Sequence, residues 1–309
     1  MLETLLTSES DDLPDLAKVD YVARIDRAID YIVQNLTEPL DLEQIAGIAH
    51  FSPFHFHRVF KALVGETLAA FVKRVRLQRA IQLMSHRPDS TLTEIALACG
   101  FGSSSDFSRS FKQHYGLPPR AFDVAAFRDA NRDALTPGRA RLPAGENPDG
   151  FVVSFRDFPT RHVAYIRVRD SYTPGSVQAC AQRLGEWAER RGYAQGQWLG
   201  YMWDDPEVVA MAKCRYDIGV QVPQRIHPDG EVGCVELSPM RVVQVQVRGG
   251  VELELRAIDW IYKTWLPSSG YVPDDQPLFE AFHGLPFAHG DEYFELDAQF
   301  PVIAGATPL

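Results

Sequence analysis

The segment from Leu42 to Phe122 contains one residue pattern twice, and this repeat constrains the fold more than any other feature of the chain. The offset between copies is 50 residues through Phe51/Phe101 and 51 from Phe56/Phe107 onward, so the second turn holds one extra residue. Repeated core aromatics, a basic pair and a closing glycine predict two helix-turn-helix units, each laying one helix on a duplex. The matched pairs include Leu42/Leu92, Ile45/Ile95, Ala46/Ala96, Arg58/Arg109, Phe60/Phe111, Lys61/Lys112, Gly65/Gly116 and Phe71/Phe122.

Length and composition predict a globular protein of about two domains. The chain has 309 residues, of which 45% are hydrophobic and 23% charged. Its four cysteines lack any CxxC spacing, so we expect free, mostly buried thiols rather than disulfides or a zinc site. No apolar run reaches the roughly 18 residues of a membrane span, and the acidic start is unlike a signal peptide. We therefore expect a cytoplasmic location.

The net charge of −10 is unevenly distributed along the chain. The formal charge is −8 over residues 1–44, +6 over residues 45–128 and −8 over residues 129–309. A basic segment within an acidic chain suits phosphate neutralisation, because each Lys or Arg contact releases condensed counterions. The basic segment is also the one that contains the repeat.

Local signals set the boundaries of the first unit. Residues 1–17 are polar and acidic, which predicts a disordered arm. Apolar residues recur at helical spacing from Asp20 to Asn35 and predict an amphipathic helix. Asp41 is the expected cap of a helix over 42–49, and Ser52 caps the next, which ends at Gly65. The expected inward stripe of that second helix is Phe56, Val59, Phe60 and Leu63.

The opposite face of this second helix carries side chains that suit contacts in the major groove. An arginine can bind a guanine edge with two hydrogen bonds, a histidine can donate to or accept from a base, and an aromatic ring can contact a thymine methyl. His55 and His57 are two residues apart, so they do not share a helix face and do not predict a metal site. The expected DNA-contacting residues here are Phe54, His55, His57, Arg58 and Lys61.

The second copy presents a different outward face. Thr91 caps the helix over 92–99, and Ser103 opens a helix with Phe107, Phe111 and Tyr115 inward. Hydroxyl groups pair with either bases or phosphates, so this helix is expected to add affinity more than specificity. Its expected contacts are Ser104, Ser105, Ser108, Arg109 and Lys112.

A continuous helical pattern from Thr67 to His86 joins the two units. At about 1.5 Å per residue this helix spans roughly 30 Å. That length places the two recognition helices about one duplex turn apart, near 34 Å, so both can enter successive major grooves. Four basic residues on this helix can also reach backbone phosphates, although for at least two of them a solvated face is the expected role: Lys73, Arg74, Arg76 and Arg79.

The stretch from about Asp20 to Phe127 closely resembles the DNA-binding domain of AraC/XylS-type transcription regulators. The resemblance rests on Ile45-Ala46, the Phe56–Lys61 and Phe107–Lys112 segments, and the Gly116–Phe122 segment. It implies an all-α DNA-binding domain over 18–128, with double-stranded DNA as partner and RNA polymerase as a further candidate. The resemblance also implies base and phosphate contacts at Phe54, His57 and Arg58 and at Ser104, Ser105, Ser108 and Arg109.

The pattern changes after Phe127. Residues 129–150 are polar and rich in Pro and Gly, which predicts a linker. Beyond it, alternating strand patterns around Val163 and Val243 share an offset of 80, and each leads into a helix, around 177–190 and 252–265. Two halves of hairpin plus helix predict an α+β domain with pseudo-twofold symmetry and a groove between the halves.

Residues 151–305 resemble the GyrI-like effector domain of Rob-like and multidrug-sensing regulators, which implies a small-molecule module with a mostly antiparallel sheet over 151–309. The resemblance rests on Phe158-Pro159, Asp204–Pro206, Cys214–Asp217, Trp265–Pro267 and Leu278–Glu280. Aromatic walls with a buried carboxylate suit aromatic or lipophilic cations. The candidate ligand residues are Tyr165, Trp187, Trp203, Tyr216, Trp265, Glu280, Tyr293 and Glu295.

Three interpretations of the second half stay open. It can sense an effector, it can hydrolyse reactive small molecules through Tyr/Glu acid–base pairs, or it can dock a protein partner. No catalytic triad, phosphate loop or metal spacing appears in the chain, so we expect neither an enzyme nor a bound cofactor.

Overall fold

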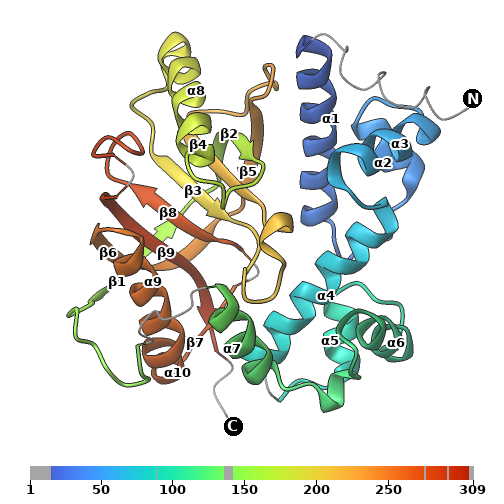
Figure 1. Ribbon diagram of the computed structural model, residues 1–309, viewed down its shortest axis with the longest axis vertical. Helices are drawn as coiled ribbons and strands as arrows, with labels where there is room; N and C mark the ends of the chain where they lie inside the picture. The colour runs from blue at the N-terminus through green and yellow to red at the C-terminus, as the bar shows by residue number, and fades with distance from the viewer. Residues whose placement is uncertain (1–14, 88, 136–141, 275, 291, 306–309) are drawn as a thin grey trace, which may run out of the picture.

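The computed structural model describes residues 15–87, 89–135, 142–274, 276–290 and 292–305. The chain forms a helical lobe, blue to green in Figure 1, and a sheet lobe, light green to red. Of the predicted arm over 1–17, residues 1–14 lie outside the described residues, and Asp15 already begins helix α1 (Asp15–Gln34). The predicted multidomain class, an all-α unit followed by an α+β unit, is confirmed.

Both helix-turn-helix units form with the predicted caps. Helices α2 (Leu42–Ile48) and α3 (Pro53–Val64) make the first unit, and α5 (Leu92–Ala98) and α6 (Ser104–Tyr115) make the second. The Ser52 and Ser103 hydroxyl groups cap α3 and α6, accepting from backbone N–H groups three residues on. Each recognition helix ends at a glycine in the left-handed region, where φ is 78° at Gly65 and 81° at Gly116.

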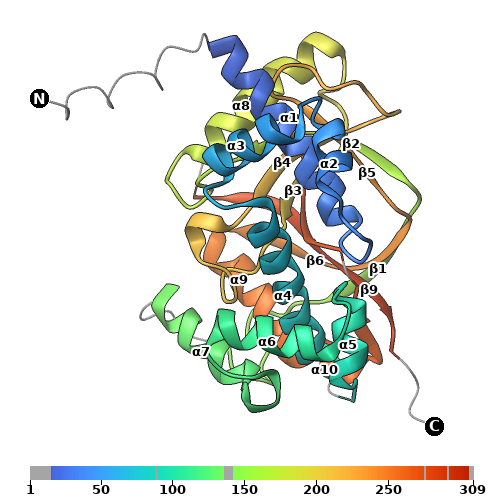
Figure 2. The same ribbon diagram turned by 90° about the vertical axis from the view of Figure 1, so that its right-hand side faces the viewer.

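The repeated apolar residues form two separate cores along helix α4 (Leu68–His86). The N-terminal half of α4 packs Phe71 and Val75 into the first unit, and its C-terminal half packs Leu77 and Ile81 into the second. Figure 2 shows α4 running from α2 and α3 to α5 and α6. Leu63, expected in the inward stripe of α3, is instead 37% exposed, because it lies near the end of the helix.

The segment expected to be a linker begins as helix. After a short 3-10 turn (Pro119–Ala121), α7 (Val124–Leu135) extends into residues 129–135. Residues 136–141 lie outside the described residues. The rest of the segment packs on the sheet lobe, because Leu142 is buried in its core and the Gly145 N–H donates to the Thr264 hydroxyl oxygen.

The sheet lobe contains an antiparallel sheet in the order β1-β6-β9-β8-β3-β4-β2-β5, with β7 pairing β9. This order reads as two matching halves that meet at β8 and β3. The helices of this lobe are α8 (Ser176–Arg191), α9 (Val251–Trp260), which continues into a π-helical turn (Ile261–Trp265), and α10 (Leu266–Ser269); a 3-10 turn (Met211–Lys213) precedes β4. Its strands are β1 (Val153–Phe158), β2 (Arg161–Val168), β3 (Trp198–Met202), β4 (Tyr216–Val222), β5 (Gly233–Leu237), β6 (Met240–Gly249), β7 (Tyr271–Pro273), β8 (Leu278–Phe282) and β9 (Phe294–Ala304).

The predicted pseudo-twofold repeat is present, but the predicted hairpins are wrong. β1 does not pair with β2: Phe155 lies opposite Val243 of β6. Likewise β5 pairs with β2, where Val235 lies opposite Val163. The two halves have exchanged their first strands. Alternation of apolar residues shows that a strand is half-buried but not which strand lies beside it, so the sequence did not reveal the exchange.

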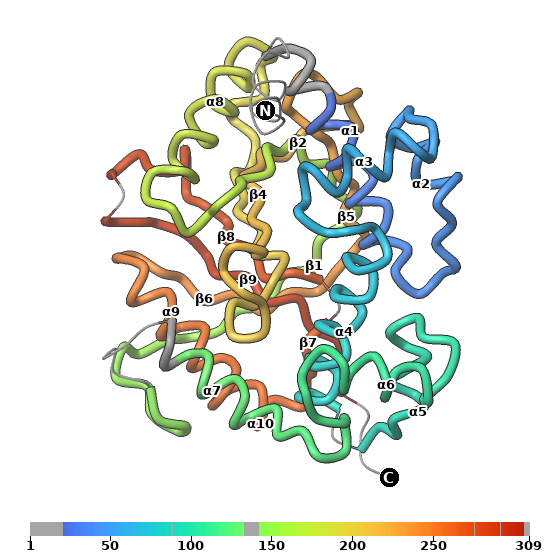
Figure 3. Tube along the Cα trace, turned by 45° about the vertical axis from the view of Figure 1, so that its right-hand side comes forward, coloured from blue at the N-terminus to red at the C-terminus, as the bar shows by residue number. Residues whose placement is uncertain are grey.

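The two faces of the sheet have different coverings. Helices α8 and α9 pack on one face, where Ile166, Ile218 and Val245 belong to the larger core. The opposite face carries a second cluster that includes Val163, Tyr201 and Phe279. Helix α1 lies beside β5, and Figures 1 and 3 both show the helical lobe alongside the sheet.

Candidate nucleic-acid interface and buried acid site

Helix α3 presents a polar and aromatic surface to solvent. Phe56 and Phe60 are fully buried, whereas Phe54 is 74% exposed. His57, Arg58 and Lys61 are also exposed, and the Arg58 guanidinium carbon lies 5.9 Å from the centre of the Phe54 ring. His55 is exposed but packs its ring against Tyr21 and Phe51, with centroid distances of 5.7 and 5.0 Å. This surface has the donors and the apolar contact that major-groove recognition needs.

The surface of α6 is more polar. Phe107 and Phe111 are fully buried, and Ser105, Arg109 and Lys112 are exposed. Ser104 and Ser108 are half-buried, so their hydroxyl groups lie at the edge of this surface. Arg109 approaches Asp106 at 3.4 Å, a carboxylate that sequence reasoning left out of the contact set. This acidic neighbour reduces the positive charge that α6 presents.

Two of the four basic residues expected near phosphates on α4 are committed to the protein interior. Arg74 is buried and donates to Glu66 at 2.7 and 2.9 Å. Arg76 donates to the backbone carbonyl oxygens of Leu36 and Glu38. Arg79 is half-buried, and Lys73 is exposed. Arg74 and Arg76 therefore neither face solvent nor reach phosphates, since both hold the helical lobe together.

An ion cluster joins the acidic face of α1 to the sheet. The Arg167 guanidinium donates to both Asp217 carboxylate oxygens at 2.9 and 2.8 Å and to Asp30 at 2.8 Å. The Tyr165 hydroxyl also donates to Asp30, and Asp26 accepts from Arg169 at 2.9 Å. Burial raises the pKa of Asp217, although Arg167 opposes that rise. The carboxylates of Asp26 and Asp30 on α1 are thus neutralised by the sheet lobe, so their charge is not turned toward DNA.

The eight predicted ligand residues do not form one site. Tyr165 and Trp203 belong to this ion cluster, where the Trp203 indole N–H donates to Asp217 at 2.6 Å. Trp265 stacks on Tyr271, and Trp187 lines a separate open groove of about 360 Å³. Sequence position could not separate these aromatics, because contacts between residues far apart in the chain decide which of them come together.

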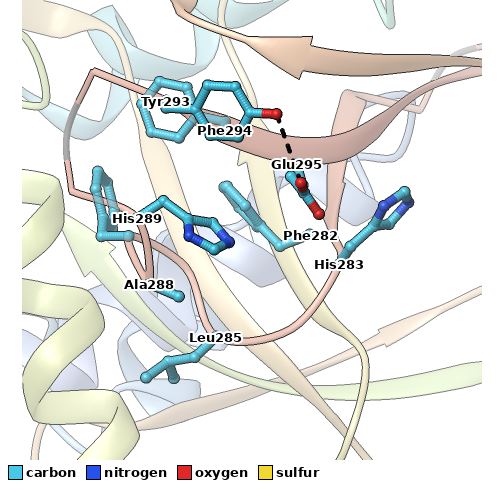
Figure 4. A pocket seen from close by; sticks show the side chains of 9 residues that line it. Phe282, His283, Leu285, Ala288, His289, Tyr293, Phe294 and Glu295 are labelled. Atoms are coloured by element: carbon cyan, nitrogen blue, oxygen red, sulfur yellow. Dashed lines mark hydrogen bonds between the residues drawn. The ribbon is translucent and has the colours of Figure 1, made fainter.

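Tyr293 and Glu295 lie at a small hollow beside the β8–β9 connection. Figure 4 shows the Tyr293 hydroxyl directed at Glu295, at 3.5 Å, with His283 and His289 nearby. The hollow measures about 10 Å³. It has room for about one water molecule, not for a ligand. The prediction for these two residues is therefore not supported by the shape of the site.

Tyr216 and Glu280 do come together, with a third residue that sequence reasoning missed. The Tyr216 hydroxyl donates to Glu280, and the Glu280 carboxyl is also hydrogen-bonded to Glu254 of α9. A Cβ atom at Gly200 would lie 2.1 Å from Tyr216 Oη and 2.2 Å from Glu280 Oε2. A larger residue at this point of β3 would therefore displace the Tyr216 hydroxyl and the Glu280 carboxyl from where they meet. The cluster lies where the two halves of the sheet meet, since Gly200 is opposite Glu280.

Burial of this acid site favours the protonated forms of its two carboxyl groups. Burial raises the pKa of Glu280 and raises that of Glu254 well above its usual range, and each carboxyl lies beside the other. Like charges so close cannot both be ionised in an apolar interior. The sequence did not point to Glu254, because an acidic residue in the first turn of a helix is usually explained by its favourable interaction with the helix dipole. Within the part of the chain that the structure describes, one Glu254 carboxyl oxygen has no hydrogen-bond partner.

Comparison with known families assigns both lobes. Residues 45–124 match a helix-turn-helix domain family, and residues 151–303 match the GyrI-like small molecule binding domain family. The chain joins an AraC-type helix-turn-helix domain to a GyrI-like domain. The GyrI-like domain contains the buried acid site, and the helix-turn-helix domain contains α3 and α6. Among the described residues, no helix is long and apolar enough to cross a membrane.

Curated relatives are similar to this chain over about 100 residues. The HTH-type transcriptional regulator YbfP of Bacillus subtilis is 34% identical over 33% of this chain and 34% of its own length. The bifunctional transcriptional activator/DNA repair enzyme AdaA of the same organism is 35% identical over 32% of this chain and 46% of its own. The chain thus spans less than half the length of these relatives.

Solved structures resemble each domain separately. The DNA-binding domain of AdpA in complex with target DNA is 27% identical, covers 35% of this chain and 95% of that chain, and has a TM-score of 0.32. The EcmrR C-terminal domain is 14% identical, covers 50% of this chain and 99% of that chain, and has a TM-score of 0.38.

Proposed function

We propose that this protein is a sequence-specific transcription regulator that binds double-stranded DNA through α3 and α6 and a small effector through its GyrI-like domain. The observation that supports the DNA-binding part of this proposal is the shared architecture of α3 and α6. Both bury the repeated phenylalanines and leave a polar surface outward, at opposite ends of α4. The regulators YbfP and AdaA, which match this domain, support the same function.

The two recognition helices have different roles in this proposal. Helix α3 reads bases through Phe54, His57 and Arg58, whereas the serine-rich α6 mainly holds the phosphate backbone. The 19 residues of α4 span about 28 Å, close to the roughly 34 Å of one duplex turn. One chain can therefore occupy two successive major grooves.

The proposed effector is a small aromatic or lipophilic cation, bound at the buried acid site. A cation that reaches Glu280 stabilises the ionised carboxylate that burial disfavours, and Tyr216 offers a π face beside it. Glu254 supplies a second carboxyl and an oxygen without a partner. A neutral molecule of the same shape gains neither interaction, so charge is the feature that the site selects.

Selection of duplexes from a random pool on the full chain tests the DNA-binding half. Enrichment of one motif that Arg58→Ala no longer enriches is the expected result. Arg190→Ala is the matched control, because it removes the same charge from an exposed position on α8. Failure of the wild-type chain to enrich any motif would overturn sequence-specific binding.

Binding of aromatic ammonium ions and their neutral isosteres tests the effector half. We expect the cations to bind more tightly than the isosteres and Glu280→Gln to remove that preference. Mass spectrometry of the ligand after incubation separates sensing from catalysis. Unchanged ligand supports the regulator, whereas a hydrolysed ligand would assign the domain to an enzyme.

A further inference from the structure

Four consecutive residues, Cys214 to Asp217, contact four different parts of the molecule. They close the connection between β3 and β4 and begin β4 itself. Neighbouring side chains on a strand point to opposite faces of a sheet, which allows such a short segment to reach separate sites.

The β3–β4 connection, residues 203–215, is built into the core of the second helix-turn-helix unit. Val208, Val209 and Cys214 are buried in the same cluster as Phe107 and Phe111 of that unit. The connection lies between the sheet and α4 in Figure 1. The core of the second unit is therefore completed by residues of the GyrI-like domain.

Ion pairs fix the same connection to α7. Arg128 contacts Asp205 at 2.6 Å and Glu207 at 3.4 Å, and Arg132 also pairs with Glu207. The Asn131 amide donates to the Glu207 carbonyl oxygen at 2.6 Å. These groups are about three-quarters or more buried, so the contacts are only partly screened by solvent.

Arg215 attaches the end of the connection to the first turn of α4. Its side chain and backbone N–H donate to Asp204 at 2.7 to 2.8 Å, which closes the connection on itself. Its guanidinium carbon lies 5.7 Å from the centre of the Phe71 ring. Phe71 belongs to the core of the first helix-turn-helix unit.

The next two residues connect the buried acid site to α1. Tyr216 donates to Glu280 on one face of the sheet, and Asp217 accepts from Arg167 on the other face. Arg167 in turn donates to Asp30 of α1. Tyr216 therefore lies in the chain directly between Arg215, which contacts α4, and Asp217, which contacts α1 through Arg167.

Helix α9 provides a second connection from the same site. It carries Glu254, and five residues later Asp259 pairs with Arg132 of α7 at 3.0 Å. Tyr262, in the π-helical turn that follows, stacks on His86 at the end of α4, with a centroid distance of 5.7 Å. Helix α9 therefore contacts both α7 and the end of α4, the helices on either side of the second helix-turn-helix unit.

We propose that residues 203–217, with Tyr216 at their base, relay occupancy of the buried acid site to the two helix-turn-helix units. A cation that binds the Glu280 carboxylate competes with the Tyr216 hydroxyl for it. Release of Tyr216 changes the start of β4, and the packed connection carries that change to α6 and α7. This relay rests on the proposed function of the acid site, but its structural step can be measured without ligand or DNA.

Hydrogen exchange of the full-length Tyr216→Phe variant tests the structural step. This substitution removes only the hydroxyl that Glu280 accepts from. We expect amides of α6 and α7 to exchange at least about fivefold faster than in the wild type. A factor of about five is the lower end of the range found for coupling between sites in allosteric proteins. Tyr271→Phe, on β7 and away from the connection, is the matched control. Unchanged exchange in α6 and α7 would overturn the relay.

A double-variant cycle on the selected duplex tests the route. We expect Tyr216→Phe to change the DNA dissociation constant at least about fivefold. This effect should fall below about twofold when Asp205→Asn and Glu207→Gln release the connection from α7. An undiminished effect would overturn the route through residues 203–215. If the wild-type chain selects no duplex, the proposed function fails, while the exchange measurement still decides the relay.

Discussion

Replacing Arg167 with methionine should destabilise the protein by about 3–5 kcal/mol. The Arg167 side chain is 4% exposed and the Asp217 side chain 1% exposed, so solvent cannot take over their interaction. The substitution removes both hydrogen bonds to Asp217 and the one to Asp30. Among the described residues, the side-chain donor that Asp217 keeps is the Trp203 indole. A buried carboxylate that loses its cation carries the desolvation cost without compensation.

Urea denaturation of the full chain, followed by circular dichroism, measures this loss. Arg241→Met is the control, because its pair with Asp157 is exposed and should leave the free energy of unfolding unchanged. The double variant Arg167→Met, Asp217→Leu should recover much of the loss, since it removes the unpaired charge as well. A loss below about 1 kcal/mol for Arg167→Met alone would refute the reasoning, because that is the scale of an exposed pair.

Arg58→Ala should weaken specific DNA binding by about 1–3 kcal/mol, whereas Lys112→Ala should mainly lower the salt dependence by about one unit, both measured by titration at several salt concentrations. Equal losses on specific and random duplexes for Arg58→Ala would exclude base reading. Gly100→Ala should lower the free energy of unfolding by at least about 1 kcal/mol, since φ is +80° and the new Cβ would lie 2.5 Å from a backbone oxygen; Gly102→Ala, in open space, should not. Burial and a nearby arginine lower the pKa of His86 to about 4 from 6.5, so the unfolded chain binds the proton first. Stability should fall by up to about 3 kcal/mol as pH drops from 6.5 to 4, and denaturation of His86→Leu should lack this slope.

The helical lobe could be predicted closely because its signals are local. Caps at Asp41, Ser52 and Thr91 satisfy backbone groups within three residues, and a 3.6-residue period fixes which side of a helix is buried. The same logic failed for Arg74 and Arg76. A cation on a helix face has the same sequence signal whether it meets solvent or a distant acceptor.

The sheet lobe was predicted less completely because its decisive contacts are long-range. Its repeat and its two helices follow from the sequence, but the exchanged strands and the scattered aromatics do not. Glu254 and Glu280 lie 26 positions apart and meet only because α9 packs on the sheet where its two halves join. The cluster around Asp30 and Arg167 joins residues separated by 137 positions. The periodicity of apolar residues along a sequence does not predict contacts between residues so far apart.

The exchange of first strands has a consequence for the order in which the chain can fold during synthesis. The first helix-turn-helix unit can form its core once the N-terminal half of α4 has emerged, but β1, which is made later, then waits for a partner. That partner, β6, begins at Met240, so at least 80 further residues must leave the ribosome before β1 can pair. Contacts between distant segments form slowly, and until then β1 remains an unpaired strand open to wrong partners. The gap between synthesis of β1 and β6 is therefore the interval in which this protein most needs protection from aggregation.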